Sequence, residues 1–262
     1  MSGGCEGCRS GEALDFDFSM AFQPIFDVRE SRVWGYEALI RGLAGEGAYS
    51  ILSQVNDTQK YRFDQLCRTK AIELAARLFP HGENLRLSIN FLPNAVYEPA
   101  ACLRATLLAA RRHAFPLNAL MFEFTESEEI VDTGHLQRIL AEYRRQGFVT
   151  ALDDFGAGYA GLGLLVDFQP DLIKLDMKLL RGIDTSYPRQ VVVATIAAAA
   201  RALDIEVLAE GVETEAEFTI LQTAGIHLFQ GYYFARPAFE ALPQLNLRSA
   251  HDMAAQLGVQ VC

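Results

Sequence analysis

The fold is indicated first by the segment Phe148-Val149-Thr150-Ala151-Leu152-Asp153-Asp154-Phe155, an apolar run that closes on two adjacent aspartates. Its β-branched and aromatic residues predict a buried strand. Similar apolar segments follow at 172–177 and 206–210, with a stretch of helical spacing at 188–203 between them. Strand, helix and strand in this order are typical of a sheet covered by helices.

The same alternation extends outward over most of the chain. Eight strands alternating with helices predict a (β/α)8 TIM-like barrel, for which about 250 residues is typical. A doubly wound open sheet is the alternative, and periodicity alone does not separate the two. Several predicted helices end at a glycine, such as Gly147 or Gly225, that suits a helix C-cap. The other expected strands are 20–26, 33–40, 85–91, 120–125 and 228–234, and the other expected helices are 61–79, 99–112, 135–146 and 214–224.

The helix at 61–79 illustrates how a packing face is predicted from spacing. Positions three and four residues apart share a face of a helix, and we expect this face to be buried. Cys67 on this face, and Cys102 on the next helix, are interpreted as small core residues. The predicted buried face carries Phe63, Leu66, Cys67, Leu74 and Leu78, and the residues largely off it are Arg68, Lys70 and Arg77.

Composition restricts the class of function. The chain has 262 residues, half of them hydrophobic, and 33 acidic against 23 basic residues give a net charge of −10. Bulk binding of nucleic acid or of an anionic membrane needs clustered Lys and Arg and is therefore not expected. The longest apolar run, 191–200, is about half the length of a membrane span. With no secretory signal, we expect a cytoplasmic protein.

Three regions are predicted: a flexible leader at 1–17, a barrel domain at 18–245 and a helical tail at 246–262. The leader carries Cys5 and Cys8, and an isolated pair of this spacing is more typical of incidental thiols than of a zinc or redox site. Fewer than twenty residues precede the first expected strand, so a sensor domain or protein is expected to act in trans.

Polar residues recur where the predicted strands end. Functional residues of a barrel lie at these C-terminal strand ends, and a charge inside an apolar strand is costly unless it is paired or bound to metal. Converging carboxylates favour hard divalent cations such as Mg²⁺ or Mn²⁺, and two ions could clamp a phosphodiester and activate water. A salt-bridged barrel mouth around the single lysine is the alternative. The residues are Glu37, Asn90, Glu123, Asp153, Asp154, Lys174, Glu210 and Gln230.

With these residues in place, the chain from about 20 to 240 resembles the EAL-domain family of cyclic di-GMP phosphodiesterases. The resemblance implies hydrolysis of cyclic di-GMP to linear 5′-pGpG, a first strand antiparallel to the others, and a homodimer. Eight motifs carry it in order: Phe22-Gln23-Pro24-Ile25, Tyr36-Glu37-Ala38-Leu39-Ile40-Arg41-Gly42, Ser88-Ile89-Asn90-Phe91-Leu92-Pro93, Glu123-Phe124-Thr125-Glu126, Asp153-Asp154-Phe155-Gly156-Ala157-Gly158-Tyr159, Ile173-Lys174-Leu175-Asp176, Ala209-Glu210-Gly211-Val212-Glu213 and Gln230-Gly231-Tyr232.

The resemblance also implies roles for single residues. Lys174 corresponds to the lysine that helps activate water, and Glu37 and Glu210 are expected to be catalytic as well. Glu126 corresponds to a residue that supports the loop after the fifth strand. The implied ligands of two Mg²⁺ or Mn²⁺ ions are Glu37, Asn90, Glu123, Asp153, Asp154 and Glu210, and the implied substrate contacts are Gln23, Leu39, Arg41, Glu213 and Gln230.

One departure from the family affects the loop after the paired aspartates. Many members carry hydroxyl residues where this chain has Ala157, Ala160 and Gly161, so order in that loop and the turnover rate are in question. A receptor that binds cyclic di-GMP without hydrolysing it is therefore the second hypothesis. A barrel that only docks another protein is the third, although such a protein has no need of a carboxylate cluster.

Overall fold

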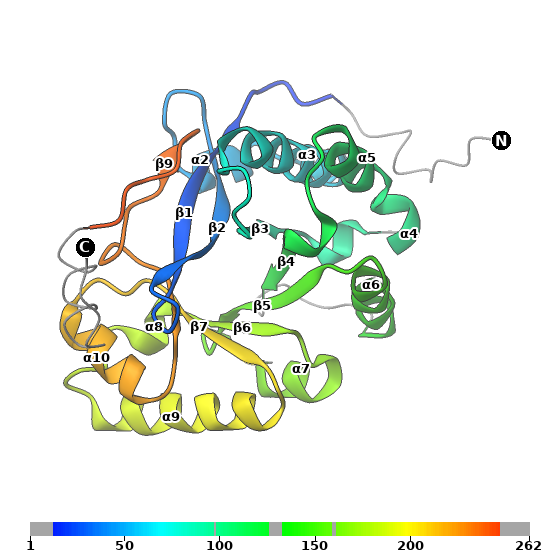
Figure 1. Cartoon of the computed structure of the whole chain (residues 1–262). Coiled ribbons are helices and arrows are strands. Elements are labelled where there is room, and N and C mark those ends of the chain that lie inside the picture. The colour runs from blue at the N-terminus through cyan, green and yellow to red at the C-terminus, as the bar shows by residue number, and fades with distance from the viewer. Residues whose placement is uncertain (1–12, 97, 126–132, 159–160, 247–262) are drawn as a thin grey trace.

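A computed structural model describes residues 13–96, 98–125, 133–158 and 161–246 of the chain. One sheet runs in the order β2-β3-β4-β5-β6-β7-β8-β1-β9, and the additional pairing of β2 with β1 closes it into a barrel (Figure 1). Neighbouring strands from β2 to β8 are parallel, whereas β1 is antiparallel to β2 and β8. The predicted TIM-like barrel and its antiparallel first strand are confirmed, and the doubly wound alternative is wrong.

The strands lie close to the predicted segments. Their bounds are β1 Ser19–Asp27, β2 Arg32–Arg41, β3 Arg86–Asn90, β4 Leu120–Thr125, β5 Val149–Phe155, β6 Leu172–Leu175, β7 Glu206–Ala209, β8 Leu228–Phe229 and β9 Ala238–Phe239. β8 is shorter than expected because the chain turns at Gly231, where a Cβ would lie 2.1 Å from the Val212 carbonyl oxygen. The sequence did not predict β9, which pairs with β1 over two residues.

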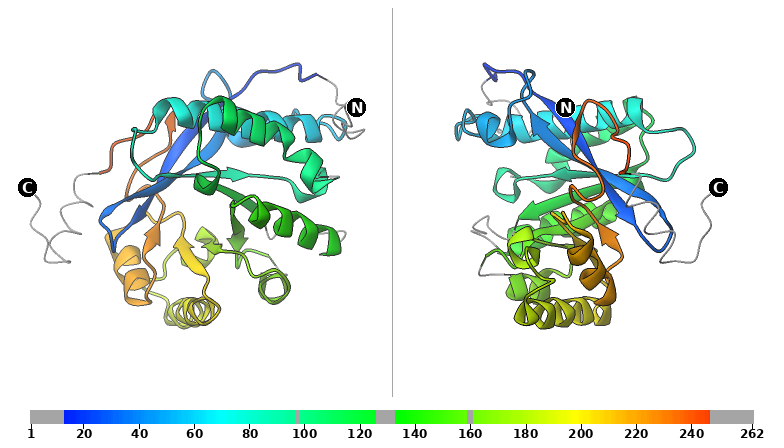
Figure 2. Two further views of the ribbon diagram at one scale, coloured as in Figure 1. Left: turned by 45° about the vertical axis from the view of Figure 1, so that its right-hand side comes forward. Right: turned by 90° about the vertical axis from the view of Figure 1, so that its left-hand side faces the viewer.

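The helices lie outside the strands in each view (Figure 2). Gly147 and Gly225 follow α6 and α10 with φ of +84° and +89°, as expected for C-caps. The short helices α2, α7 and α8 were not predicted. The bounds are α2 Ala48–Leu52, α3 Lys60–Leu78, α4 Pro99–Cys102, α5 Arg104–Arg112, α6 Thr133–Arg145, α7 Gly161–Phe168, α8 Met177–Leu180, α9 Tyr187–Ala202 and α10 Glu215–Thr223, with 3-10 turns η1 Pro93–Ala95 and η2 Leu117–Ala119.

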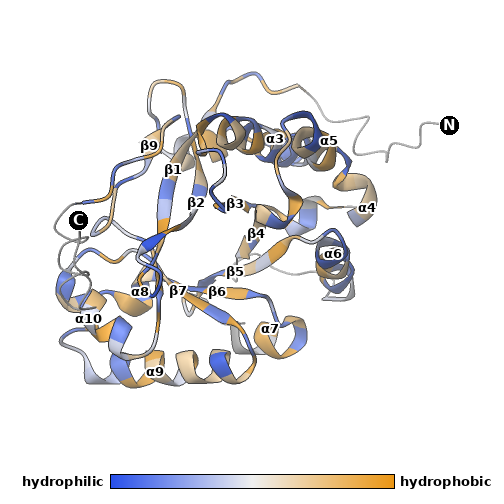
Figure 3. Ribbon diagram, in the orientation of Figure 1, coloured by the Kyte–Doolittle hydropathy of each residue, from blue (hydrophilic) through white to orange (hydrophobic). Residues whose placement is uncertain are grey.

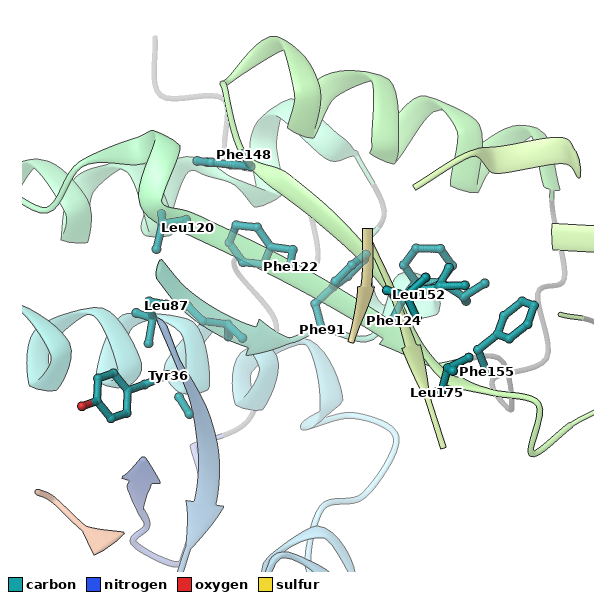
Figure 4. Packing of buried hydrophobic residues seen from close by; sticks show 14 of the residues in the cluster. Tyr36, Leu87, Phe91, Leu120, Phe122, Phe124, Phe148, Leu152, Phe155 and Leu175 are labelled. Carbon is teal, nitrogen blue, oxygen red and sulfur yellow. The ribbon is translucent and has the colours of Figure 1, made fainter. Parts of the chain in front are cut away.

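Two hydrophobic clusters follow from strand alternation. The larger cluster fills the space between the strands and the helices, and Figure 4 shows Phe122 and Phe124 of β4 within it. The smaller cluster lies inside the barrel and includes Met121, Ala151 and Leu208. Because successive side chains of a strand point to opposite faces, Glu123 points to the inside of the barrel, like Met121. In Figure 3 β6 and β7 are mostly hydrophobic, whereas much of α6 is hydrophilic.

The prediction for α3 is wrong at two residues. Leu66, placed on the buried face, is 37% exposed, and Arg68, placed largely off it, is fully buried. Arg68 is accommodated because it forms an ion pair with Asp64 one turn earlier on the helix. The predictions for Cys67 and Cys102 hold, since Cys102 is buried and Cys67 packs against the core. Among the described residues, no helix is long and apolar enough to cross a membrane.

Candidate active site

Four carboxylates meet one ammonium group at the C-terminal ends of the strands. Lys174 of β6 places Nζ 2.6 Å from Glu210, 2.8 Å from Glu123, 3.1 Å from Asp153 and 3.6 Å from Glu37. The lysine side chain is only 1% exposed, and burial alone would lower its pKa. The surrounding carboxylates reverse this effect and hold the pKa of Lys174 well above its ordinary value, so the group carries a full charge.

A bulge in β5 brings two adjacent aspartates to the same place. The pairing of β5 with β6 shifts register between Leu152 and Phe155, and Asp154 has a φ of +56°. A regular strand would point Asp153 and Asp154 to opposite faces, whereas this geometry turns both toward the barrel mouth. Burial, together with the charges of Asp153 and Asp176, raises the pKa of Asp154 to about 6.

Two amide side chains orient the carboxylate of Glu37, and a third extends the network. Asn90 at the end of β3 donates to Oε1 at 3.1 Å, and Gln230 after β8 donates to Oε2 at 2.7 Å. Gln23 lies beside Glu37 in the β1–β2 register and accepts a hydrogen bond from Gln230 at 3.2 Å. The sequence predicted Glu37, Asn90, Gln23 and Gln230 separately, and the fold brings them into one network.

Glu123 is the most deeply buried member of the cluster. Its side chain is fully buried, and its carboxylate oxygens accept hydrogen bonds from Lys174 and from the hydroxyl of Ser88. Burial outweighs the attraction of Lys174 and raises the pKa of Glu123 to about 8. Burial also raises the pKa of Glu210 well above its ordinary value. The single ammonium therefore does not compensate the charge of the surrounding carboxylates.

The donor set fits hard divalent cations. One triad of Glu37, Glu123 and Asp153 and a second triad of Asp153, Asp154 and Glu210 each bring three carboxylate oxygens within 4.8 Å of one another. The triads share Asp153, which is the arrangement that two neighbouring ions would require. Lys174 does form the salt bridges expected if the cluster were only a salt-bridged barrel mouth. Five carboxyl groups around one ammonium still leave an excess of negative charge for cations to bind.

Two cavities open beside this cluster. The larger, of about 480 Å³, has Gln23, Glu37, Lys174, Glu210 and Gln230 in its lining. Its rim includes Tyr232 and an ion pair at 2.8 Å between Arg181 and Glu213. The second cavity, of about 370 Å³, is mostly apolar and reaches Asn90, Asp153 and Asp154. The first is lined largely by charged and polar residues and the second mostly by apolar ones, and both reach Asp153 and Asp154.

Of the remaining predicted residues, some line a cavity, one does not, and others lie outside the described residues. Leu39 lines the apolar cavity, two residues beyond Glu37 on the same face of β2. Arg41, at the end of β2, donates to the Ile40 carbonyl oxygen at 2.7 Å and lines neither cavity. Glu126 and Ala160, together with Cys5 and Cys8, lie outside the described residues, as do most of the predicted leader and nearly all of the predicted tail.

Sequence reasoning missed two residues of the site. Ser88 lies two positions before Asn90 and donates to Glu123, and Asp176 lies two positions after Lys174 and lines the larger cavity. The alternation of strand residues gives the signal that could have found them, since positions i and i+2 face the same side. Asp176 also accepts a hydrogen bond from the Lys178 amide at 2.8 Å and so caps α8.

Known proteins resemble this chain over most of its length. Residues 12–237 match the family model described as EAL domain. The chain is 32% identical over 225 residues to the blue light- and temperature-regulated antirepressor BluF of Escherichia coli, covering 86% of this chain and 55% of that protein. It is 33% identical over 229 residues to the cyclic di-GMP phosphodiesterase PA2567 of Pseudomonas aeruginosa, covering 84% and 38%. The chain thus spans about half or less of the length of these two curated relatives.

Solved structures give a similar result. A standalone EAL protein from Vibrio cholerae O395, in a form bound to c-di-GMP, is 53% identical with a TM-score of 0.85, covering 90% of this chain and 98% of that one. BlrP1 of Klebsiella pneumoniae, in a complex with manganese and cy-diGMP, is 37% identical with a TM-score of 0.80, covering 85% and 56%.

Proposed function

Because the chain belongs to the EAL domain family of cyclic di-GMP phosphodiesterases, we propose that it hydrolyses cyclic di-GMP to linear 5′-pGpG. The observation that carries the proposal is the pair of carboxylate triads that share Asp153 at the barrel mouth. The relative PA2567 is named as such an enzyme, and the V. cholerae structure is described as bound to c-di-GMP. Both support the same substrate for this chain.

The proposed cofactor is a pair of Mg²⁺ or Mn²⁺ ions. When bound, the two ions would stabilise charge on the phosphodiester and lower the pKa of water for in-line attack. Asn90 and Gln230 fix the orientation of Glu37, so that its carboxylate is held in place before substrate arrives. The proposed ligands are Glu37, Asn90, Glu123, Asp153, Asp154 and Glu210.

Lys174 is proposed to act on the attacking water and on developing phosphate charge. Its ammonium group stays protonated, and so it donates hydrogen bonds and does not act as a base. Glu37 and Glu210, which both contact Lys174, are proposed as the carboxylates next to the reacting atoms. A fixed positive charge in a buried site stabilises an anionic transition state more than it would in water.

The substrate is proposed to lie across both cavities. Gln23, Gln230 and Glu213 line the polar cavity and offer hydrogen bonds to a guanine or a ribose. Leu39 in the apolar cavity offers a surface to a base. Arg41 is proposed to meet a phosphate with its two parallel donors, which requires its guanidinium to leave the Ile40 carbonyl oxygen.

A timed incubation tests the proposal. Purified protein is incubated with cyclic di-GMP and Mg²⁺ or Mn²⁺, and the products are separated by chromatography. We expect a pGpG peak that disappears with EDTA and in Glu37→Ala. Glu142→Ala, which removes a half-buried carboxylate on α6 that pairs with Arg145, serves as the control and should retain the activity. Full activity of a folded Glu37→Ala protein would overturn the assignment of Glu37.

The second candidate is a receptor that binds cyclic di-GMP without hydrolysing it. The identity of 32% to a protein named as an antirepressor favours keeping it. In the incubation above, this candidate gives intact substrate under both metals, together with saturable binding in a titration. Homodimer formation and input from a sensor in trans stay predictions, and light scattering on the purified chain tests the first.

A further inference from the structure

A buried ion pair lies directly behind the candidate active site. Asp64 and Arg68 of α3 are 3% and 0% exposed, and their side chains approach to 2.6 Å. Arg68 also donates to the hydroxyl of buried Tyr143 at 2.8 Å. A buried ion pair adds little stability compared with well-packed apolar residues of the same volume. Stability alone is therefore a poor reason for placing two charges here.

The pair is connected to the chain that leaves β3. Three consecutive residues are each held by a different partner: the Asn90 side chain donates to Glu37 at 3.1 Å, the Phe91 amide to the Glu123 carbonyl oxygen at 2.9 Å, and the Leu92 amide to Asp64 at 3.1 Å. Asp64 is thus the anchor of the backbone two residues after Asn90.

Arg68 acts on the same strands from their outer side. Its guanidinium carbon lies 5.4 Å from the ring centres of both Phe91 and Phe122, which Figure 4 shows in the core. Phe91 follows Asn90 and Phe122 precedes Glu123, and Asn90 and Glu123 are partners in the β3–β4 register. The guanidinium therefore holds the outward neighbours of two residues that point into the site.

We propose that Asp64 and Arg68 are positioning residues that hold Asn90 and Glu123 in the geometry needed to bind a divalent cation. The inference rests on the proposed function, because it concerns the same carboxylate site. Asp64 supplies the acceptor for the Leu92 amide, and Arg68 pairs with that carboxylate while lying against the two rings. Neither residue contacts the carboxylate cluster directly in any described interaction.

Two charge-free double variants isolate the hydrogen bond to Leu92. Asp64→Asn with Arg68→Met retains an acceptor oxygen, whereas Asp64→Leu with Arg68→Met removes it, and both remove the two charges together. Amide hydrogen exchange is measured without metal, and Mn²⁺ affinity is measured by electron paramagnetic resonance with Mn²⁺ as the only ligand. Leu74→Ala is the control, because it weakens the same helix at a buried site away from Leu92.

We expect the leucine double variant to exchange at Phe91 and Leu92 at least tenfold faster and to bind Mn²⁺ at least tenfold more weakly. The asparagine double variant should stay within about threefold of wild type, and Leu74→Ala should raise exchange broadly with unchanged Mn²⁺ affinity. Equal behaviour of the two double variants would overturn the inference. If the leucine variant does not fold, Tyr143→Phe replaces it, and unchanged exchange at Phe91 and Leu92 is the contrary result.

The exchange measurement needs no substrate and no ion. A protein that hydrolyses nothing but shows the expected exchange and Mn²⁺ pattern would contradict the proposed function and leave the positioning role intact. If the protein hydrolyses cyclic di-GMP while the leucine double variant shows wild-type exchange and wild-type Mn²⁺ affinity, the positioning role is contradicted and the proposed function is left intact.

Discussion

Nζ of Lys174 lies 2.8 Å from Oε2 of Glu123, and both side chains are at most 1% exposed. Glu123 nevertheless has its pKa raised to about 8 by burial, although Lys174 opposes this effect. Since the same ammonium group also contacts three other carboxylates, its charge is divided among them. The metal-free site is therefore short of positive charge, and the first predictions follow from this shortage.

Removal of the lysine charge should have opposite effects on folding and on metal binding. Lys174→Met leaves the carboxylates without their partner, and we expect the free energy of unfolding in EDTA at pH 8 to fall by about 3–5 kcal/mol. Mn²⁺ affinity should rise, because a competing cation is gone, while hydrolysis is lost. Urea unfolding and Mn²⁺ titration measure the two effects. Lys178→Met, on the exposed side of α8, should change neither, and a weaker Mn²⁺ affinity of Lys174→Met would contradict this account.

Metal binding should stabilise the folded chain. A ligand at 100 times its dissociation constant adds about 2.7 kcal/mol to the free energy of unfolding, which is about 5–10 °C in thermal midpoint for a domain of this size. We expect this shift with Mn²⁺ and its reversal with EDTA in a thermal scan. Glu37→Gln should show a much smaller shift, and an equal shift in that variant would place the ion elsewhere.

Asp154 should lower the stability of the metal-free chain and yet be required for hydrolysis. Its pKa is raised to about 6 by burial and by Asp153, so its ionised form destabilises the fold. This penalty is absent below the unfolded pKa near 4 and complete above pH 6. Asp154→Asn should therefore raise the free energy of unfolding by about 1–2 kcal/mol at pH 8 without metal, as measured in urea, and should abolish hydrolysis.

The control for this variant is Asp204→Asn. Asp204 also has a positive φ, +59°, but lies on the exposed surface after α9. A similar stabilisation there would assign the effect to the backbone conformation and not to the repulsion between Asp153 and Asp154. A loss of stability in Asp154→Asn would contradict the raised pKa itself.

Glu217 should stabilise the loop that carries Glu213 in a pH-dependent manner. Burial opposes ionisation of Glu217, but hydrogen bonds from the amides of Glu213, Gly182 and Thr214, with Arg181 nearby, lower its pKa overall. A lowered pKa gives stability above the unfolded value of about 4.5 that is lost as the pH falls through the folded value.

Glu217→Gln should accordingly lower the free energy of unfolding by about 1 kcal/mol at pH 7, and the difference from wild type should shrink as the pH approaches 4. Urea unfolding at both pH values measures it. Glu215→Gln, an exposed position in the same first turn of α10, is the matched control. If the difference in free energy of unfolding between wild type and Glu217→Gln does not change with pH, the electrostatic explanation is contradicted.

Several features of the fold and the site were predictable from residues alone. Apolar runs predicted the strands and their alternation with helices, because a strand buried on both faces has few polar positions. The number of strands and the chain length favoured a barrel, although periodicity alone did not exclude a doubly wound sheet. The polar strand ends gave the cluster, because parallel strands bring their C-terminal ends to one face. Glu37, Glu123, Asp153, Lys174 and Glu210 were found in this way.

The errors have a common physical cause. Helix periodicity treats a charged residue as facing solvent, so Arg68 was placed largely off the buried face; only the tertiary structure supplies Asp64, Tyr143 and two rings around it. Ser88 was missed because a lone hydroxyl in a strand attracts little attention, although alternation places it on the same face as Asn90. Only the fold puts Glu123 next to it.

The sequence by itself determined which chemical groups the barrel mouth contains, because side-chain identity and strand alternation are local properties. The tertiary structure alone decided how those groups share charge: one ammonium within 4 Å of four carboxylates, and two adjacent aspartates turned to one side by a bulge. Electrostatic energy depends on distances between atoms that are far apart in the chain and on their burial, and neither quantity exists before the chain has folded.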